Sequence, residues 1–401
     1  MRTHTRVAFL VLVCLGLSSL VALGQRQGQI LERPVPQVQS ADEGSSVQAM
    51  QAPLLGFVYG AERSELRPIL GIPGASLFGG PISLPAGVTG VYFAPHQNYA
   101  LLAHRVVGSI DLITFQGAEE ASVTAICGAI SQPDLITFSP SGSAAVLYSR
   151  RAGQIQVITG LPSAPQVARI IATGELPDAL QLLAIADDGV TLLEGTSRNA
   201  IYLLPAAGSP QLLYSAADLG GMVFAPRTAD VVVFDRGAGT LFLLQEVSSA
   251  SSYLALAEGM TGVSGNAFLQ VNGESAVLAG TNTSTVWQID LESLEVQSTR
   301  LPVTAHTLQP LETPGKFLLF YKPDQPAWIL DTSGESGTVS FVPASTEPRL
   351  NPTRVPLSST GGELLDTSPQ PHLANRIVIG SACSESSEKP GAERPFARPK
   401  F

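Results

Sequence analysis

A paired-strand signature recurs seven times along the chain, and this repetition constrains the fold more than any single motif does. In each copy a polar turn separates two apolar runs, as in Val231–Phe234, the turn Asp235–Gly239 and the run Thr240–Leu244. Gly and Asp tolerate the backbone angles of tight turns, and Val, Ile and Phe fit a pleated, half-buried surface. Each copy therefore predicts a β-hairpin.

The seven copies are evenly spaced. The apolar residues that open the strand after each turn are Leu66, Ile110, Ile155, Ile201, Leu241, Val286 and Ala327. Neighbouring members of this series lie 40–46 residues apart. A further strand that ends in a turn precedes several hairpins, as in Val91–Pro95 and Ile136–Pro140, and another follows, as in Val167–Ile171. Four short strands fill such a period, which is typical of β-propeller blades.

We therefore predict an all-β chain that forms a β-propeller over residues 53–345, with seven four-stranded blades and six as the alternative. A β-sandwich or a series of small β domains would also give short strands, but rarely one constant spacing. The first hairpin lacks an obvious strand before it. Ring closure would then borrow a strand from residues 338–342 or 376–379.

The segment ITFSPSGSAAVLYSRRAGQIQVITG, at residues 136–160, resembles repeats of bacterial secreted β-propeller proteins of the WD-type and YVTN-like superfamily. The resemblance extends over about residues 54–345. Neither a Trp-Asp dipeptide nor a Tyr-Val-Thr-Asn run is present. The resemblance implies a propeller fold and points to no specific subfamily.

Residues 1–24 read as an export signal. Arg2 and Arg6 give a positive start, Val7–Leu17 is apolar, and a small-x-small cleavage site ends at Gly24. We expect cleavage and export to the periplasm or the exterior, with no membrane span left afterwards. An uncleaved membrane anchor is the alternative, but the apolar run is short for a bilayer.

Two tails flank the predicted propeller. Residues 25–52 are rich in Gln, Ser and Pro, and residues 346–401 are rich in Pro, Ser and Glu. Such segments bury too little apolar surface to offset the entropy lost on folding. We expect a flexible leader and a mostly disordered C-terminal tail, apart from the strand at 376–379.

The charge pattern argues against two classes of partner. The formal net charge is −10, and the Lys and Arg residues are scattered without a basic stripe. Nucleic acid and anionic membranes bind through clustered positive charge. We expect neither, and we expect a monomer.

The polar residues match no common catalytic or metal-binding motif. The histidines are isolated, Gly262–Asn266 misses the Gly-x-Ser-x-Gly pattern at its last position, and Asp187–Asp188 precedes Gly189 as in a turn. We therefore predict no catalytic residue, no cofactor-binding residue, no metal ligand and no cofactor.

Four residues remain as candidates for a specific role. Cys127 and Cys383 could pair in an oxidising compartment, although the apolar stretch around Cys127 favours a buried free thiol. Trp287 and Trp328 occupy the same place in consecutive repeats. They predict either an aromatic platform for a glycan or peptide or, as the favoured interpretation, packing between blades.

These observations favour a non-enzymatic, exported binding or scaffold propeller with an unknown protein or glycan ligand. The alternative is a lactonase-like propeller hydrolase with a metal or carboxylate site at the axial channel. The residues that line the channel separate the two hypotheses: converging carboxylates or imidazoles favour the enzyme, whereas apolar, Ser, Thr and Gly side chains favour binding.

Overall fold

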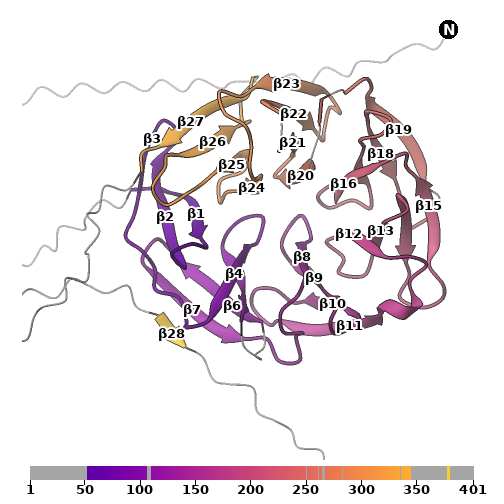
Figure 1. The fold of residues 1–401 in the computed structure, drawn as a ribbon, viewed down its shortest axis with the longest axis horizontal. Coiled ribbons are helices and arrows are strands. Elements are labelled where there is room, and N and C mark those ends of the chain that lie inside the picture. Colours follow the sequence, from indigo (N-terminus) through magenta and orange to yellow (C-terminus); the bar gives the residue numbers. More distant parts are fainter. Residues whose placement is uncertain are drawn as a thin grey trace, which may run out of the picture. The chain divides into compact units, whose positions relative to one another are not determined.

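The computed structural model describes residues 52–105, 110–249, 251–260, 262–263, 267–281, 283–334, 336–344 and 377–379. Seven antiparallel sheets follow one another around a ring in chain order (Figure 1). This arrangement confirms the prediction of a seven-bladed β-propeller. Apart from strands, the described residues contain one short 3-10 helix, Thr173–Glu175.

The strands of blades 1 to 4 are β1 (Leu54–Gly60), β2 (Glu65–Ile72), β3 (Ala75–Phe78); β4 (Val88–Phe93), β5 (Tyr99–His104), β6 (Asp111–Gln116), β7 (Glu120–Ala125); β8 (Leu135–Phe138), β9 (Ala144–Ser149), β10 (Gln154–Thr159), β11 (Gln166–Ala172); β12 (Leu180–Ile185), β13 (Leu192–Thr196), β14 (Ala200–Leu204), β15 (Gln211–Ser215). The strands of blades 5 to 7 are β16 (Leu219–Phe224), β17 (Val231–Asp235), β18 (Thr240–Gln245), β19 (Ser252–Ala257); β20 (Ala267–Asn272), β21 (Ser275–Gly280), β22 (Thr285–Asp290), β23 (Val296–Arg300); β24 (Gln309–Pro310), β25 (Lys316–Phe320), β26 (Ala327–Asp331), β27 (Thr338–Val342). A last strand, β28 (Ile377–Ile379), joins blade 2.

The hairpins recognised in the sequence are the second and third strands of the blades. The hairpin around the turn Asp235–Gly239 becomes β17 and β18, with Val231 paired to Leu244 and Asp235 paired to Thr240. The strands found upstream become inner strands such as β8, and those downstream become outer strands such as β11.

Burial falls from the middle of each blade to its rim. Every residue of β17 is buried, whereas the first four residues of the outer strand β19 are exposed. A second strand is covered on both faces because neighbouring blades stack face to face, so its residues are apolar without alternation. An outer strand has water on one side, so polar residues are tolerated there.

The core consists of clusters that each join two neighbouring blades. Val233 of blade 5 packs with Leu193 of blade 4, while the adjacent Phe234 packs with Leu278 of blade 6. Fully burying such a side chain stabilises the folded state by about 1.5–3 kcal/mol relative to leaving it exposed. Each sheet is therefore stabilised mainly by its neighbours, as the repeat architecture requires.

Blade 1 departs from the four-stranded pattern. Its sheet contains the three described strands β1, β2 and β3. Four consecutive residues of β1 are buried, as in the second strands of the other blades, so the place of an inner strand beside β1 is taken by other groups. Neither suggested closing strand lies there: residues 338–342 form the outer strand of blade 7, and residues 377–379 pair with β7 of blade 2.

The expected signal (residues 1–24), leader (25–52) and C-terminal tail (346–401) fall outside the described residues, apart from residue 52 and β28. Within the described part of the chain, no helix has the length and apolar character needed to cross a membrane.

Candidate functional site

Six inner strands surround a cavity on the axis of the ring. The strands are β4, β8, β12, β16, β20 and β24, and Figure 1 shows them around the centre of the propeller. The cavity measures about 440 Å³. Pockets of a few hundred Å³ are the usual size for small-molecule or side-chain binding. The axial channel is therefore the principal candidate site.

The lining of this channel is apolar or uncharged. It consists of Val91, Tyr92, Phe93, Pro95, Leu135, Ile136, Thr137, Phe138, Ser139, Pro140, Leu182, Leu183, Gly220, Gly221, Met222, Val223, Ala267, Phe268, Leu269, Gln270, Val271, Thr307, Leu308, Gln309 and Pro310. Burial raises the pKa of the Tyr92 phenol, which keeps it neutral. The channel can offer hydrogen bonds from hydroxyls, amides and strand edges, but these lining residues supply no charge.

The turns after the inner strands hydrogen-bond to one another around one mouth of the channel. The Asp187 carboxylate in blade 4 accepts the backbone N–H of Ser141 in blade 3 at 2.7 Å and that of Arg227 in blade 5 at 3.1 Å. Its neighbour Asp188 accepts the N–H groups of Val190 and Thr191 within its own turn. The prediction of turn chemistry at Asp187–Asp188 is confirmed.

Two glutamine side chains occupy the place of the inner strand in blade 1. Gln97 is fully buried, and its Oε1 accepts the backbone N–H of Phe57. Its Nε2 donates to the carbonyl oxygens of Phe57 at 3.3 Å and Pro310 at 2.7 Å. Gln309 Nε2 also donates to the Phe57 carbonyl at 3.1 Å. The backbone of Phe57 at the edge of β1 is thus hydrogen-bonded by two amides, one from Gln97, which also bonds Pro310 of blade 7, and one from Gln309 of blade 7 itself.

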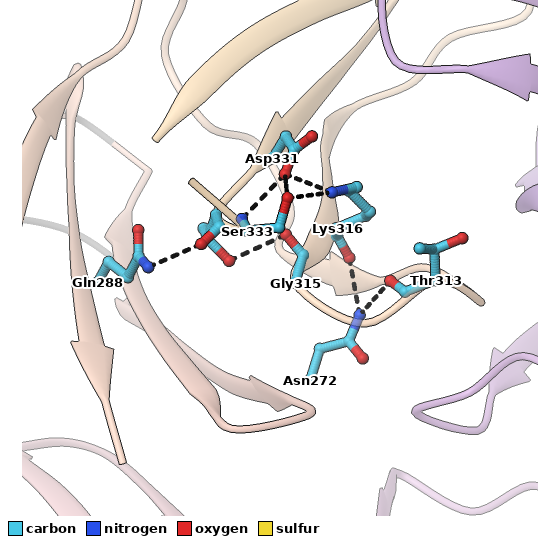
Figure 2. A network of polar contacts seen from close by, with 8 residues as sticks. Asn272, Gln288, Thr313, Gly315, Lys316, Asp331 and Ser333 are labelled. Carbon is cyan, nitrogen blue, oxygen red and sulfur yellow. Dashed lines mark hydrogen bonds and ion pairs between the residues drawn. The ribbon is translucent and has the colours of Figure 1, made fainter. Parts of the chain in front are cut away.

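A polar network joins blades 6 and 7 (Figure 2). Lys316, at the start of β25 and only 7% exposed, donates to the carboxylate of Asp331 and, at 2.8 Å, to the hydroxyl of Ser333. Burial would raise the pKa of the Asp331 carboxyl, but hydrogen bonds from Lys316 and Ser333 hold it below its ordinary value. Asp331 is therefore ionised and neutralises the lysine.

The same network reaches blade 6 through two amide side chains. Asn272 Nδ2 lies 3.0 Å from the carbonyl oxygen of Lys316 and 3.1 Å from that of Thr313. Gln288 Nε2 donates to the Thr332 carbonyl at 2.9 Å. Figure 2 shows these side chains converging on the turns around Gly315 and Ser333. The network holds two turns of blade 7 against blade 6, and none of these residues lines the axial channel.

One buried carboxyl, that of Glu194, has no hydrogen-bond partner among the described residues. Glu194 on β13 is 0% exposed, and both of its oxygens are unpaired. Desolvation, with a smaller contribution from nearby Asp178, raises the pKa of Glu194 to about 7. The carboxyl is thus largely protonated in mildly acidic solution, which lowers the cost of its burial.

The described histidines lie apart from one another and make separate contacts. His104 Nε2 lies 2.9 Å from Asp111 Oδ2, and the ring of His306 lies against that of Phe320. Within the described ranges, no three His, Cys, Asp or Glu side chains are grouped as metal ligands.

The two tryptophans lie in different gaps between blades. Trp287 packs on the cluster shared by blades 5 and 6, and Trp328 packs on the cluster shared by blades 6 and 7. The Trp328 ring is 5.8 Å from that of Phe341. Both side chains are half-buried. An aromatic platform at these positions stays a prediction.

Cys127 differs from the expected buried free thiol. It is exposed, just beyond the end of β7, and it is disulfide-bonded. The apolar neighbours of Cys127 do not bury it, because Ile126 is buried while the next residue turns outward. Cys383 lies outside the described residues.

Short-range patterns could not identify the glutamines or the polar network. Gln97 lies 40 residues from Phe57 and 213 from Pro310 along the chain. The channel lining did carry a signal, since Val91–Pro95 and Ile136–Pro140 were recognised as strands preceding the hairpins.

Comparisons with known proteins support the fold. No protein-family model matches the sequence, and no curated protein matches it. A functionally unknown protein from Desulfotomaculum acetoxidans is similar in structure, with 15% identity, a TM-score of 0.50, and coverage of 73% of this chain and 100% of that protein. At this identity the similarity concerns the fold alone.

Two further solved structures show weaker likeness. A putative 6-phosphogluconolactonase from Bacteroides fragilis has 12% identity and a TM-score of 0.49, covering 74% of this chain and 95% of that protein. PorZ, a surface component of the type-IX secretion system of Porphyromonas gingivalis, has 12% identity and a TM-score of 0.48. The match covers 74% of this chain and 39% of PorZ. This chain is a seven-bladed β-propeller.

Proposed function

We propose that this protein is an exported, non-enzymatic binding or scaffold propeller whose axial channel takes an uncharged group of a protein or glycan ligand. The observation that carries the proposal is the lining of the channel. The lining combines apolar side chains such as Leu183 and Val223 with neutral polar ones such as Thr137 and Gln270.

Such a lining suits a neutral group for a physical reason. A charge that enters the channel would lose hydration and meet no opposite charge among the lining residues, which is costly. A sugar hydroxyl face or a neutral side chain would instead exchange water for hydrogen bonds from Thr137, Gln270 or Thr307, and would bury apolar surface against Val223.

Catalysis by acid–base or metal-assisted hydrolysis needs titratable groups within hydrogen-bond reach of the reacting atoms. In the axial channel the lining residue that titrates is Tyr92, and burial raises its pKa away from neutral pH. This chemistry supports binding over the lactonase-like alternative.

The test compares a channel variant with a matched rim variant. Thr137→Trp fills the channel from β8, whereas Thr338→Trp adds the same bulk to an exposed site on the outer strand β27. Wild type and both variants are screened against arrays of neutral oligosaccharides and unstructured peptides. We expect wild type and T338W to bind a common probe and T137W to lose at least about tenfold in affinity.

Two results would count against this function. One is binding that T137W leaves unchanged, because the ligand would then sit elsewhere. The other is ring opening of glucono-δ-lactone by wild type and T338W but not by T137W, which would establish the hydrolase. Circular dichroism and thermal unfolding confirm that both variants fold.

A further inference from the structure

A groove opens at the rim of the ring between blades 5 and 6. It lies between the outer strand β19 of blade 5 and the strands β22 and β23 of blade 6 (Figure 1). Its volume is about 450 Å³, which is a usual size for a small-ligand site. The groove shares no lining residue with the axial channel. It is therefore a separate candidate site, and an inference drawn from it does not rest on the proposed function.

Trp287 of β22 lines this groove together with two hydroxyl side chains. Strand residues two apart share a face, so Thr285 lies on the same side of the sheet as Trp287. Ser298 of β23 is directly opposite Trp287 in the register and projects to that side too. All three residues line the groove. Further along this face, Ile289 packs in the core cluster shared by blades 5 and 6, so the groove continues the gap between these blades outward.

The opposite wall carries a carboxylate on an anchored segment. Met260 holds this segment, because its side chain is buried in the same core cluster and its N–H donates to the carbonyl oxygen of Gly239 at 2.9 Å. Two residues earlier, Glu258 is exposed and lines the groove. Within the described part of the chain, Glu258 makes no hydrogen bond or ion pair. The groove thus offers a ligand one negatively charged acceptor.

Trp287 differs from Trp328, which occupies the same place in the next blade. The ring of Phe341 lies 5.8 Å from that of Trp328. Among the residues that the structure describes, no aromatic ring packs against Trp287. The half-buried indole of Trp287 is therefore available to a ligand in the groove, whereas Trp328 already has an aromatic partner.

The chemistry of these groups matches a neutral sugar. One face of a hexopyranose presents C–H groups that pack well on an indole ring, and its hydroxyls both donate and accept hydrogen bonds. The hydroxyls of Thr285 and Ser298 do the same, and the Glu258 carboxylate is a strong acceptor. An acidic sugar would be repelled by this carboxylate. We propose that the groove between blades 5 and 6 is a saccharide site in which a neutral hexopyranose stacks on Trp287 and donates hydrogen bonds to Glu258.

A quaternary ammonium group is the other ligand that an aromatic ring and a carboxylate suit. Such cations are bound by cages of several aromatic rings, and a single exposed ring attracts them weakly. Trp287 has no second ring beside it among the described residues, while the neighbouring hydroxyls of Thr285 and Ser298 suit a sugar. These observations favour the saccharide.

Intrinsic fluorescence tests the site, because the chain contains two tryptophans, Trp287 and Trp328. Trp328→Phe leaves Trp287 as the reporter in the groove, and Trp287→Phe leaves Trp328 as a matched control. Both variants are titrated with the methyl glycosides of D-glucose, D-galactose and D-mannose up to about 50 mM. This range exceeds the dissociation constant on the order of 1 mM that a ligand of this size reaches. We expect a saturable change of emission in W328F and none in W287F.

A second pair of variants tests the carboxylate in the W328F background. Glu258→Ala removes the acceptor in the groove, and Glu292→Ala makes the same change at an exposed turn outside it. We expect the dissociation constant of the glycoside to rise at least about fivefold in E258A and to stay unchanged in E292A. Because Glu258 is exposed, this variant keeps the test valid even where a tryptophan variant fails to fold.

Four results would overturn the proposal. They are no emission change in W328F with any of the three glycosides, an equal change in W287F, an affinity that E258A leaves unaltered, and a response of W328F to tetramethylammonium chloride but to no glycoside. The last result would assign the groove to an ammonium ligand. Circular dichroism establishes that each variant is folded before it is titrated.

Discussion

The side-chain amide of Gln97 hydrogen-bonds both backbone polar groups of Phe57, and so does for β1 what an inner strand does in the other blades. The N–H and C=O of one strand residue point to the same side, so both groups of Phe57 face away from β2 and from its register partner Pro68. The backbone of Phe57 therefore depends on side chains. Because Gln97 also bonds Pro310, one buried residue of blade 2 ties blade 1 to blade 7.

Replacing Gln97 with Ala should lower the free energy of unfolding by about 1–3 kcal/mol, since the buried N–H of Phe57 loses its partner while the Phe57 carbonyl keeps the hydrogen bond from Gln309. Urea unfolding followed by fluorescence measures the change. Gln211→Ala, at an exposed site on β15, is the control and should stay within about 0.5 kcal/mol of wild type. Equal stability of the two variants would contradict the role assigned to Gln97.

Gly56→Ala should disturb the same contact. Gly56 has φ +156°, and a Cβ there would lie 2.6 Å from Gln97 Oε1 and 2.9 Å from Leu311 Cδ2. We expect the free energy of unfolding to fall by about 2 kcal/mol or more. Gly80→Ala is the control, because a Cβ at this exposed glycine meets nothing within 4 Å. If the clash acts through Gln97, the cost of G56A falls in a Q97A background, which a double-mutant cycle would reveal.

Glu194 makes stability depend on pH. Its pKa is raised to about 7 in the folded state, above its ordinary value near 4.5. Between these values the unfolded chain releases the proton while the folded chain keeps it. The stabilisation is therefore fully present below about pH 4.5 and is lost as pH rises to about 7, by roughly 3 kcal/mol.

Glu194→Gln tests this dependence because Gln is nearly the same size and does not titrate. Urea unfolding of both proteins from pH 4.5 to pH 8.5 measures the difference between their free energies of unfolding. We expect the free energy of unfolding of the variant to rise relative to that of wild type up to about pH 7. Above that pH the difference between the two should stay constant. Parallel curves across the whole range would rule out a titrating Glu194.

Lys316→Met should lower the free energy of unfolding by about 3 kcal/mol, because it leaves the carboxylate of Asp331 without its buried cationic partner. The double variant K316M/D331L should recover part of this loss, since no unpaired charge remains. Thermal or urea unfolding at pH 7 measures each variant. The control is Arg227→Met in the exposed Arg227–Glu274 pair, where we expect at most about 1 kcal/mol.

Acid should weaken the same ion pair in a defined direction. The pKa of Asp331 is lowered in the folded protein, so the stabilisation is complete above the ordinary Asp value and disappears as pH falls through the lowered one. Wild type should therefore lose stability below about pH 4 relative to Asp331→Asn. Acid unfolding curves that run parallel for the two proteins would show that Asp331 is not stabilised by Lys316.

The sequence predicted the blades because the information for a blade is local. All four strands of blade 5 lie between Leu219 and Ala257, and the turn Asp235–Gly239 sets the register of its central hairpin. Fully apolar runs such as Val231–Phe234 indicated strands buried on both faces. The channel lining followed from the same repeats, because the first strand of each unit faces the axis.

The sequence did not predict how the ring closes or how Cys127 is used. The expected closing strands took other places: Thr338–Val342 became the rim of blade 7, and Ile377–Ile379 paired with blade 2. The exposure of Cys127 depends on where β7 ends in space rather than on its apolar neighbours.

Alternating strands and turn residues act over a few bonds, so the amino-acid order alone determined an all-β repeat architecture and favoured seven units over six. The tertiary structure decided which polar groups meet across the seam, because Gln97, Phe57 and Pro310 are brought together only when seven sheets complete one turn. The physical reason is that a buried N–H or C=O must find a partner wherever the ring places it, and that partner need not be near in sequence.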